Sequence, residues 1–290
     1  MSSIVVRAPA TSANLGAGFD CLGLALDLWN EVIATPSEFD ADDDANLILR
    51  AARATYALVG AEYPGFALHC TNRIIYSRGL GSSAAAITCG VLFANHCLGS
   101  PLDESAILDL AVRLEGHPDN VVPCVLGGAR VALRLDDGHV VQSQVSLALQ
   151  LTAVCFVPEI GIATPHARGL LPVSVSHADA VFNVARASLM VAALSSGRAD
   201  LLAEATRDRL HQPYRVPLFP AGATLLDAAM HAGALGSFVS GAGPTVLALC
   251  ASNSAVGAVS DALTSTARHE GVAGSLLRLG LSDQGAHVVA

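Results

Sequence analysis

The most informative absence in this 290-residue chain is lysine, because all 16 of its basic residues are arginine. A Walker A loop requires a lysine before its Ser/Thr, and a protein kinase requires one on its third strand, so both designs are excluded. Enzymes that form a lysine Schiff base and Ser-x-x-Lys hydrolases are excluded as well. If this chain binds phosphate, backbone amides, serines, metal and arginine must do it.

Charge and aromatic side chains are also scarce. Charged residues make up 14% and aromatic residues 4%, against 52% hydrophobic residues, which predicts a large aliphatic core. The net charge of −9 argues against general binding of nucleic acids or anionic membranes. The negative net charge does not exclude nucleotide binding, because backbone amides and a bound metal at the site act on the phosphates more strongly than the diffuse field of the whole protein.

Paired cysteines and long uncharged apolar runs are missing too. The seven cysteines are scattered without a Cys-x-x-Cys pair, which favours buried, reduced thiols over disulfides or a zinc site. The N-terminus has no long apolar segment, and no uncharged apolar run of 18 residues indicates a membrane span. We therefore expect a cytoplasmic protein.

The chain does contain one segment that predicts an anion site, Tyr76 to Ala86, with the sequence YSRGLGSSAAA. Gly79 and Gly81 permit positive φ and close backbone approach, and Ser82 and Ser83 are expected to cap a helix that follows. Free N–H groups at a helix start behind a glycine turn bind anions, and a nucleotide phosphate is the obvious one. The serine hydroxyls could also hold Mg²⁺.

Helices and strands are mixed without strict βαβ alternation, which predicts α+β layers. A domain boundary is expected near residue 147, giving domains at 1–147 and 148–290. Strands are predicted at 3–7 (ending before Pro9), 22–35, 65–75, 127–135, 140–145, 149–157, 235–239, 245–250 and 275–279. Helices are predicted at 46–59, 83–98, 103–115, 176–194, 198–209, 222–232 and 254–269. The acidic run at 40–44 is expected to be a solvated loop.

Two other glycine-rich segments, residues 9–23 and 240–245, accompany the phosphate-loop candidate. Each alone is typical of a tight turn. Residues 79–84 also fit the dinucleotide fingerprint G-x-G-x-x-G/A, with Asp103 downstream, so an NAD-dependent oxidoreductase is a rival interpretation. Against it, the loop is not in a first βαβ unit, and Asp103 after Pro101 is better explained as a helix cap.

The segment EGHPDN at residues 115–120 is a further polar cluster. Glu115 could supply a carboxylate to a Mg²⁺ ion whose other ligands are phosphate oxygens and Ser83. His117 and Asn120 could form hydrogen bonds with a substrate. Taken singly, such residues are more often structural.

Together these segments resemble the GHMP kinases, the family named for galactokinase, homoserine kinase, mevalonate kinase and phosphomevalonate kinase. RGLGSSAAA resembles the family's phosphate loop. The resemblance implies an α+β fold with an N-terminal domain like ribosomal protein S5 domain 2 and a C-terminal ferredoxin-like α/β sandwich. It also implies ATP and Mg²⁺, with Ser83 and Glu115 as metal ligands. The implied ATP-binding residues are Ser77, Arg78, Gly79, Leu80, Gly81, Ser82, Ser83, Ala84 and Ala85.

Five segments resemble more narrowly the branch of the family that phosphorylates homoserine in threonine biosynthesis. They are PATSANLGAGFDCLGLAL, EGHPDNVVP, VPEIGIATPHAR, DRLHQPYR and SGAGPT. A homodimer is usual for the family. One departure is visible, since the family often has proline where this chain has Ile75.

The acceptor implied by this resemblance is a zwitterion with a primary hydroxyl. Its ammonium needs a carboxylate, which Asp20 could supply, and its carboxylate needs arginines such as Arg168 and Arg215. Other residues of the matching segments would complete the pocket: Asn14, His117, Asn120, Thr164 and Gly243.

The implied catalytic residues are Asn120 and Arg168. An amide cannot act as a base, and Asp119 is expected to point elsewhere if Asn120 faces the acceptor. We therefore expect direct transfer without a side-chain base, by positioning and electrostatics. Two rivals stay open: a kinase of another small alcohol, such as shikimate or mevalonate, and a noncatalytic protein of the same fold.

Overall fold

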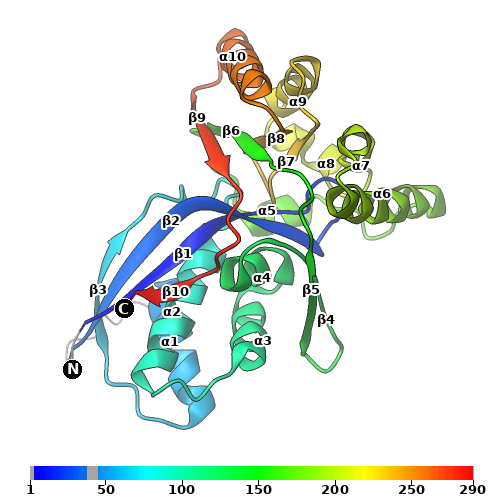
Figure 1. Ribbon diagram of the computed structural model, residues 1–290. Coiled ribbons are helices and arrows are strands. Elements are labelled where there is room, and N and C mark those ends of the chain that lie inside the picture. Colours follow the sequence, from blue (N-terminus) through cyan, green and yellow to red (C-terminus); the bar gives the residue numbers. More distant parts are fainter. Residues whose placement is uncertain (1–2, 38–44, 290) are drawn as a thin grey trace.

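The computed structural model describes residues 3–37 and 45–289, so the acidic run at 40–44 lies outside the described residues. Figure 1 shows two sheets, each covered by helices, with the first sheet below the second. The strands are β1 (Ile4–Ala13), β2 (Leu22–Pro36), β3 (Phe66–Thr71), β4 (Ala129–Arg134), β5 (Val140–Val145), β6 (Thr152–Pro158), β7 (Gly236–Val239), β8 (Val246–Cys250), β9 (Gly274–Gly280) and β10 (His287–Val289). The α-helices are α1 (Leu47–Val59), α2 (Ser82–Cys97), α3 (Glu104–Glu115), α4 (Pro118–Leu126), α5 (Thr164–Gly169), α6 (His177–Ser196), α7 (Leu202–Ala205), α8 (Gln212–Arg215), α9 (Ala221–His231) and α10 (Asn253–His269), with 3₁₀ turns η1 (Ala199–Leu201) and η2 (Val216–Leu218).

The first sheet is antiparallel, in the order β10-β1-β2-β4-β5, with β3 also paired to β2. The prediction that β1 ends before Pro9 is wrong. The pairing with β2 shifts register between Pro9 and Ala10, so a bulge absorbs the missing N–H of proline and the strand continues to Ala13. This continuation carries the chain into the glycine-rich segment at residues 14–23.

Helix α2 is the central helix of this half, as predicted. It contacts α1, α3, α4 and β1, and it has buried residues on every face, among them Ala85, Ile87, Val91 and Phe93. An apolar helix surrounded in this way is held by packing and not by its own propensity. Its N-terminus, which carries the phosphate-loop candidate, is therefore firmly placed.

The second sheet has the antiparallel order β7-β8-β6-β9, and α9 and α10 pack on it. This strand order, with crossovers between β6 and β7 and between β8 and β9, is that of a ferredoxin-like sandwich. The α+β expectation is confirmed. Strand β10, which the sequence pattern did not reveal, returns to the first sheet and pairs with β1. The division at residue 147 stays a prediction.

Several predicted boundaries are wrong for local reasons. Strand β3 ends at Thr71 because the backbone N–H groups of Arg73 and Ile74 donate to the Asn30 side chain instead of a neighbouring strand. The predicted helix at 198–209 breaks after α7, because the Asp208 carboxylate accepts N–H groups from the residues that follow it. Helices α4 and α5 were missed, each with proline in its first turn.

Among the described residues one helix, α6, has the length and hydropathy that a membrane span requires, with a mean hydropathy of 1.3. It carries Asp179 and Arg186, and its Met190 and Leu194 are buried in the core. The helix is therefore weak evidence for a span.

Candidate functional site

A cleft forms where the three glycine-rich segments meet. Residues of the β1–β2 connection, the loop before α2, the α3–α4 turn, α5 and the β7–β8 loop all line it. The loops are locked together by hydrogen bonds: Ser240 donates its hydroxyl to the Gly79 carbonyl at 2.6 Å, and the Gly241 N–H donates to the Ala13 carbonyl at 3.2 Å. Segments that are each typical of a simple turn thus build one site from both sheets.

The loop before α2 has the geometry of an anion site. Gly81, with φ of 70°, is the N-cap residue, and no side chain of the described residues caps the helix. The prediction that Ser82 and Ser83 are caps is wrong, because both are the first residues of the helix itself. Their position leaves the N–H groups of the first turn open to a ligand in the cleft. Gly79 has no room for a side chain, since a Cβ there would lie 2.1 Å from the Ser240 carbonyl oxygen.

The nine loop residues proposed to bind ATP divide into three sets: five that line the cleft, three that are buried behind it, and Arg78. Those that line the cleft are Ser77, Gly79, Gly81, Ser82 and Ser83. Three others are buried in the core behind it: Leu80, Ala84 and Ala85. The Arg78 guanidinium donates to the carbonyls of Tyr76, Pro158 and Glu159, so this side chain ties the loop to the second sheet.

Ser83 and Glu115 come together as the resemblance implied. The Ser83 hydroxyl donates to Glu115 Oε2 at 2.6 Å. Burial raises the pKa of the Glu115 carboxyl, and the bond from Ser83 and the nearby His117 partly offset this. No group of three His, Cys, Asp or Glu side chains suited to a metal occurs in the described part of the chain. One carboxylate and one hydroxyl fit a Mg²⁺ ion whose remaining ligands are phosphate oxygens and water.

The α3–α4 turn brings a further polar group to the cleft. Asp119 lines it, contrary to the expectation that this side chain points elsewhere, because α4 begins at Pro118 and places residues 119 and 120 in one helical turn. His117 Nδ1 lies 2.6 Å from Asp119 Oδ1. Burial lowers the pKa of His117, but Asp119 and Glu115 outweigh burial and raise it. Asn120 Oδ1 accepts the Thr11 hydroxyl at 2.7 Å, which orients its amide nitrogen away from that contact.

Asp20 and Arg168, proposed for opposite ends of the acceptor, pair with each other. Two hydrogen bonds of 2.8 and 2.7 Å join the guanidinium to the carboxylate, and each side chain is 34% exposed. Asp20 has φ of 57°, and its N–H donates to Asn14 Oδ1 at 3.0 Å. The Asn14 amide nitrogen donates to the Gly241 carbonyl, so Asn14 positions Asp20 against the β7–β8 loop. A left-handed aspartate held in this way is strain at a candidate functional site.

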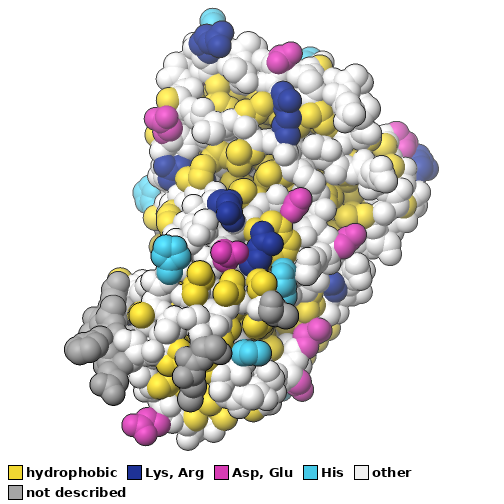
Figure 2. Space-filling view, turned by 60° about the vertical axis from the view of Figure 1, so that its left-hand side comes forward, with side chains coloured by type: hydrophobic (Ala, Val, Ile, Leu, Met, Phe, Trp, Pro, Cys, Tyr) yellow, Lys and Arg dark blue, Asp and Glu magenta, His cyan; other side chains and the backbone are white. Residues whose placement is uncertain are grey.

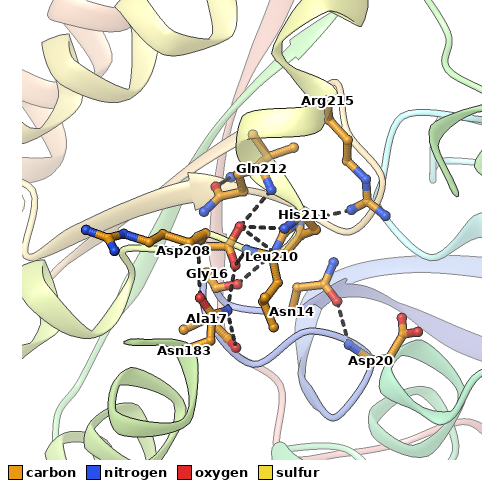
Figure 3. A network of polar contacts seen from close by, with 12 residues as sticks. Asn14, Gly16, Ala17, Asp20, Asn183, Asp208, Leu210, His211, Gln212 and Arg215 are labelled. Atoms are coloured by element: carbon orange, nitrogen blue, oxygen red, sulfur yellow. Dashed lines mark hydrogen bonds and ion pairs between the residues drawn. The ribbon is translucent and has the colours of Figure 1, made fainter. Parts of the chain in front are cut away.

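Arg215 lines the same cleft but is only 5% exposed (Figure 3). Its Nη1 donates to His211 Nδ1 at 3.0 Å and to the Gly241 carbonyl at 2.9 Å. His211 and Asp208 were not singled out from the sequence. Both belong to the segment DRLHQPYR, from which the sequence analysis took only Arg215 as a candidate.

The remaining candidates, Thr164 and Gly243, also line the cleft. Thr164 is the first residue of α5, the short helix that carries Arg168. All eight proposed acceptor residues therefore share one cavity. On the face seen in Figure 2, charged side chains of both signs are scattered among apolar and uncharged atoms, without a continuous basic surface.

This chain is similar to known proteins in both sequence and fold. Models of the GHMP kinase N-terminal and C-terminal domains match residues 46–128 and 190–269. A homoserine kinase of Desulfitobacterium hafniense is 40% identical, over 98% of this chain and 99% of the relative. One of Gloeobacter violaceus is 47% identical, over 84% and 86%. A crystal structure of homoserine kinase from Cytophaga hutchinsonii superposes with a TM-score of 0.89 at 28% identity, over 100% and 98%.

Proposed function

This chain belongs to the GHMP kinase family and, within it, to the homoserine kinases, and from that premise we propose that it transfers the ATP γ-phosphate to the hydroxyl of L-homoserine. The products are O-phospho-L-homoserine and ADP, and the reaction serves threonine biosynthesis from aspartate. The observation that carries this proposal is the composition of the cleft. An uncapped helix start lies in the same cavity as a carboxylate, Asp20, and two arginines, Arg168 and Arg215.

The loop before α2 forms the ATP side of the proposed site. Backbone N–H groups at the start of α2 would bind the phosphates, and the fixed turn at Gly79 and Gly81 lets the backbone approach them. Ser83 and Glu115 would hold Mg²⁺, which, when bound, offsets the charge of the phosphates. Glu115 fits this role because its largely buried carboxylate accepts a bond from the serine that would share the ion.

The acceptor side follows from the Asp20–Arg168 pair. A bound homoserine would exchange partners with it: the ammonium would take the Asp20 carboxylate, and the acceptor carboxylate would take Arg168 and Arg215. The Asp20–Arg168 ion pair is thus replaced by two ion pairs with the ligand, one at its ammonium and one at its carboxylate. These pairs limit the free-energy cost of desolvating the acceptor. Both members of the pair are partly exposed, so the exchange does not require a buried charge to be stranded.

The proton of the acceptor hydroxyl goes, in this proposal, to the phosphate and not to a side chain. Asn120 would orient the hydroxyl through its amide nitrogen, but an amide accepts no proton. His117 Nδ1 is bonded to Asp119, and the pKa of His117 is raised, which favours a cationic ring beside the phosphates over a basic one. Phosphoryl transfer has a loose transition state that positioning and electrostatics can stabilise.

The test is an acceptor panel with Mg·ATP. L-Homoserine, mevalonate and shikimate are supplied separately, ADP release is followed, and the product is identified by ³¹P NMR. We expect ADP release and a new phosphomonoester with homoserine alone. Turnover with mevalonate or shikimate and none with homoserine would replace this function with that of another small-alcohol kinase. No turnover with any alcohol, beside tight ATP binding, would favour a noncatalytic binding protein.

We further propose that the protein acts as a homodimer in the cytoplasm, as is usual for the family. Light scattering coupled to size-exclusion chromatography tests the first point, because a mass near twice 29.6 kDa is expected. A mass near 29.6 kDa at assay concentration would contradict it.

A further inference from the structure

Behind the acceptor side of the cleft lies a buried polar network centred on Asp208 and His211, two residues to which the proposed reaction assigns no role (Figure 3). Its base is the carboxylate of Asp208, which accepts the N–H groups of Leu210, His211 and Gln212 at 2.7 to 3.0 Å. Asn183 of α6 donates its amide to the same carboxylate. This carboxylate therefore fixes the backbone of the turn that enters α8, and with it the place of the His211 ring.

The hydrogen bonds of His211 define its tautomer. A guanidinium can only donate, so Nδ1 of His211 must accept the bond from Arg215 Nη1 and carries no proton. The proton lies on Nε2, which donates to the Gly16 carbonyl at 2.7 Å. His211 is 0% exposed, and burial lowers the pKa of the ring. Only the neutral imidazole can form both bonds at once, because the cationic ring has no acceptor at Nδ1.

Arg215 is held by one nitrogen only. The two hydrogens of Nη1 go to His211 Nδ1 and to the Gly241 carbonyl. Nε is buried and has no hydrogen-bond partner among residues 3–37 and 45–289. The bonds that this guanidinium forms within those ranges both come from Nη1, so Nη2 forms none there. Nε and Nη2 share one edge of the guanidinium, and together they form a fork that matches the two oxygens of a carboxylate. An unpaired donor in a buried arginine is costly unless a ligand accepts from it.

We propose that His211 is a positioning residue, which anchors Nη1 of Arg215 so that the Nε–Nη2 edge stays free for the carboxylate of the acceptor. The inference rests on the proposed function, in which Arg215 binds that carboxylate. Phe19 supports the geometry. Its ring stacks on His211 with centroids 5.1 Å apart, and the guanidinium carbons of Arg215 and Arg168 lie 5.4 and 5.7 Å from the Phe19 centroid.

Protonation of His211 would undo this anchor. Nδ1 would become a donor and a second cation would face Arg215. The charged groups around the ring are Arg215, Asp208, whose carboxylate lies 3.6 Å from Nε2, and Asp20. Because burial lowers the pKa of His211 below its ordinary value, near 6.5, the anchor is intact at neutral pH and is lost only on acidification. The KM for homoserine should rise there.

A double-mutant cycle between His211 and Arg215 tests the inference. The variants are His211→Phe, Arg215→Met and the double substitution, with His269→Phe as a matched control, since His269 is an exposed side chain at the end of α10. We expect His211→Phe to raise the KM for homoserine by about tenfold to a hundredfold, the value of one hydrogen bond to a charged group. The KM for ATP and kcat should change by less than about threefold. The KM of the double variant for homoserine should be no higher than that of Arg215→Met, because His211 acts through that arginine.

The outcomes separate the inference from the function on which it rests. An unchanged KM in His211→Phe beside a raised KM in Arg215→Met overturns the inference alone, as do fully additive effects in the cycle. An unchanged KM in Arg215→Met overturns the carboxylate role of Arg215 and the inference with it. If His211→Phe does not fold, His211→Asn keeps an acceptor near Nδ1 but cannot be protonated in this range. Its KM should then be flat with pH where that of the wild type rises at acid pH, and identical profiles overturn the inference.

Discussion

At the scale of single residues, the polar side chains of the cleft are mostly committed to one another. Asn14 holds Asp20, Asp119 holds His117, and Thr11 holds Asn120. This leaves little freedom for side chains to reorient during a reaction. A site of this kind works by preorganised donors and charges, which is the form of catalysis that a loose phosphoryl transition state uses most.

Asp119→Asn tests whether a side-chain base exists. The amide cannot accept the hydroxyl proton, but its oxygen can still accept a bond from His117, so the local geometry is kept. We expect kcat to fall by less than about tenfold, because only a nearby charge is lost. The measurement is kcat with saturating homoserine and ATP, alongside the thermal midpoint. A loss of three or more orders of magnitude in a folded variant would make Asp119 the base.

Glu115→Gln tests the metal ligand and the effect of its burial. Because burial raises the pKa of Glu115, its protonated form is favoured in the folded state, and that contribution is lost as pH rises through the folded pKa. The variant should therefore have a slightly higher melting temperature than the wild type at pH 7. The difference should vanish below pH ~4, where the carboxyl is protonated in both states.

The same variant should lose about a hundredfold or more in kcat/KM for Mg·ATP, the scale of a lost metal ligand. Calorimetry at several pH values and steady-state kinetics measure the two effects, with the exposed Glu270→Gln as control. Full activity in Glu115→Gln would remove Glu115 from the proposed metal site.

The residue types of the cleft could be predicted from the sequence, but their pairing could not. All eight acceptor candidates line one cavity. Asp20 accepts hydrogen bonds from Arg168, which is 148 positions away. This pairing depends on how the two sheets meet, and no local sequence pattern predicts it. The roles of His211 and Asp208 were missed for the same reason, since a buried histidine next to an arginine is visible only in three dimensions.

At the scale of elements, periodicity predicted the long helices and most strands, because each has one apolar face or is wholly apolar. Helix α4 was not predicted, because its first turn contains Pro118 and Asp119, which are equally typical of a turn. Helix 198–209 was overpredicted because Asp208 competes for backbone N–H groups that a helix would use. In the second case, hydrogen bonding by one side chain, Asp208, decided where the helix ends.

Gly79→Ala and Gly60→Ala form a matched pair for the phosphate loop. Both glycines have φ of 75°, so both substitutions carry the left-handed strain of about 1 kcal/mol. A Cβ at Gly60 meets no atom of the described part of the chain within 4 Å, whereas one at Gly79 lies 2.1 Å from the Ser240 carbonyl oxygen. We expect Gly79→Ala alone to raise the KM for ATP by at least about tenfold, because the loop must move. Equal effects of the two substitutions on unfolding and on KM would show that the close approach is unimportant.

At the scale of the whole molecule, the site exists because the two sheets are joined at their loops. Arg78 connects the two sides of this junction. It lies in the loop before α2, and its guanidinium donates to the carbonyls of Pro158 and Glu159 at the end of β6. Strand β10 adds a second connection, since the chain returns from the second sheet to pair with β1. The loop and the pocket proposed for ATP and for the acceptor therefore both depend on how these two sheets are joined.

Arg78→Met should weaken this junction. It removes donors to three backbone carbonyls, for which we expect a loss of about 1–3 kcal/mol in unfolding free energy and a several-fold higher KM for ATP. Urea denaturation and steady-state kinetics measure both. Arg198→Met is the control, because within the described ranges 3–37 and 45–289 the guanidinium of Arg198 pairs with Asp200 alone, and both side chains are exposed. If Arg78→Met and Arg198→Met have the same stability and KM, the junction does not depend on Arg78.

The most direct test of the central claim, that this cleft phosphorylates an amino-acid alcohol recognised at both charged ends, compares two acceptors in two proteins. The rate of ADP release is measured for L-homoserine and for 4-hydroxybutyrate, which lacks the ammonium, with wild type and Asp20→Asn. The account predicts that the wild type prefers homoserine by about tenfold to a hundredfold in kcat/KM, the value of one hydrogen bond to a charged group, and that Asp20→Asn loses most of this preference. Equal rates with both acceptors in the wild type, or an unchanged preference in Asp20→Asn, would contradict it.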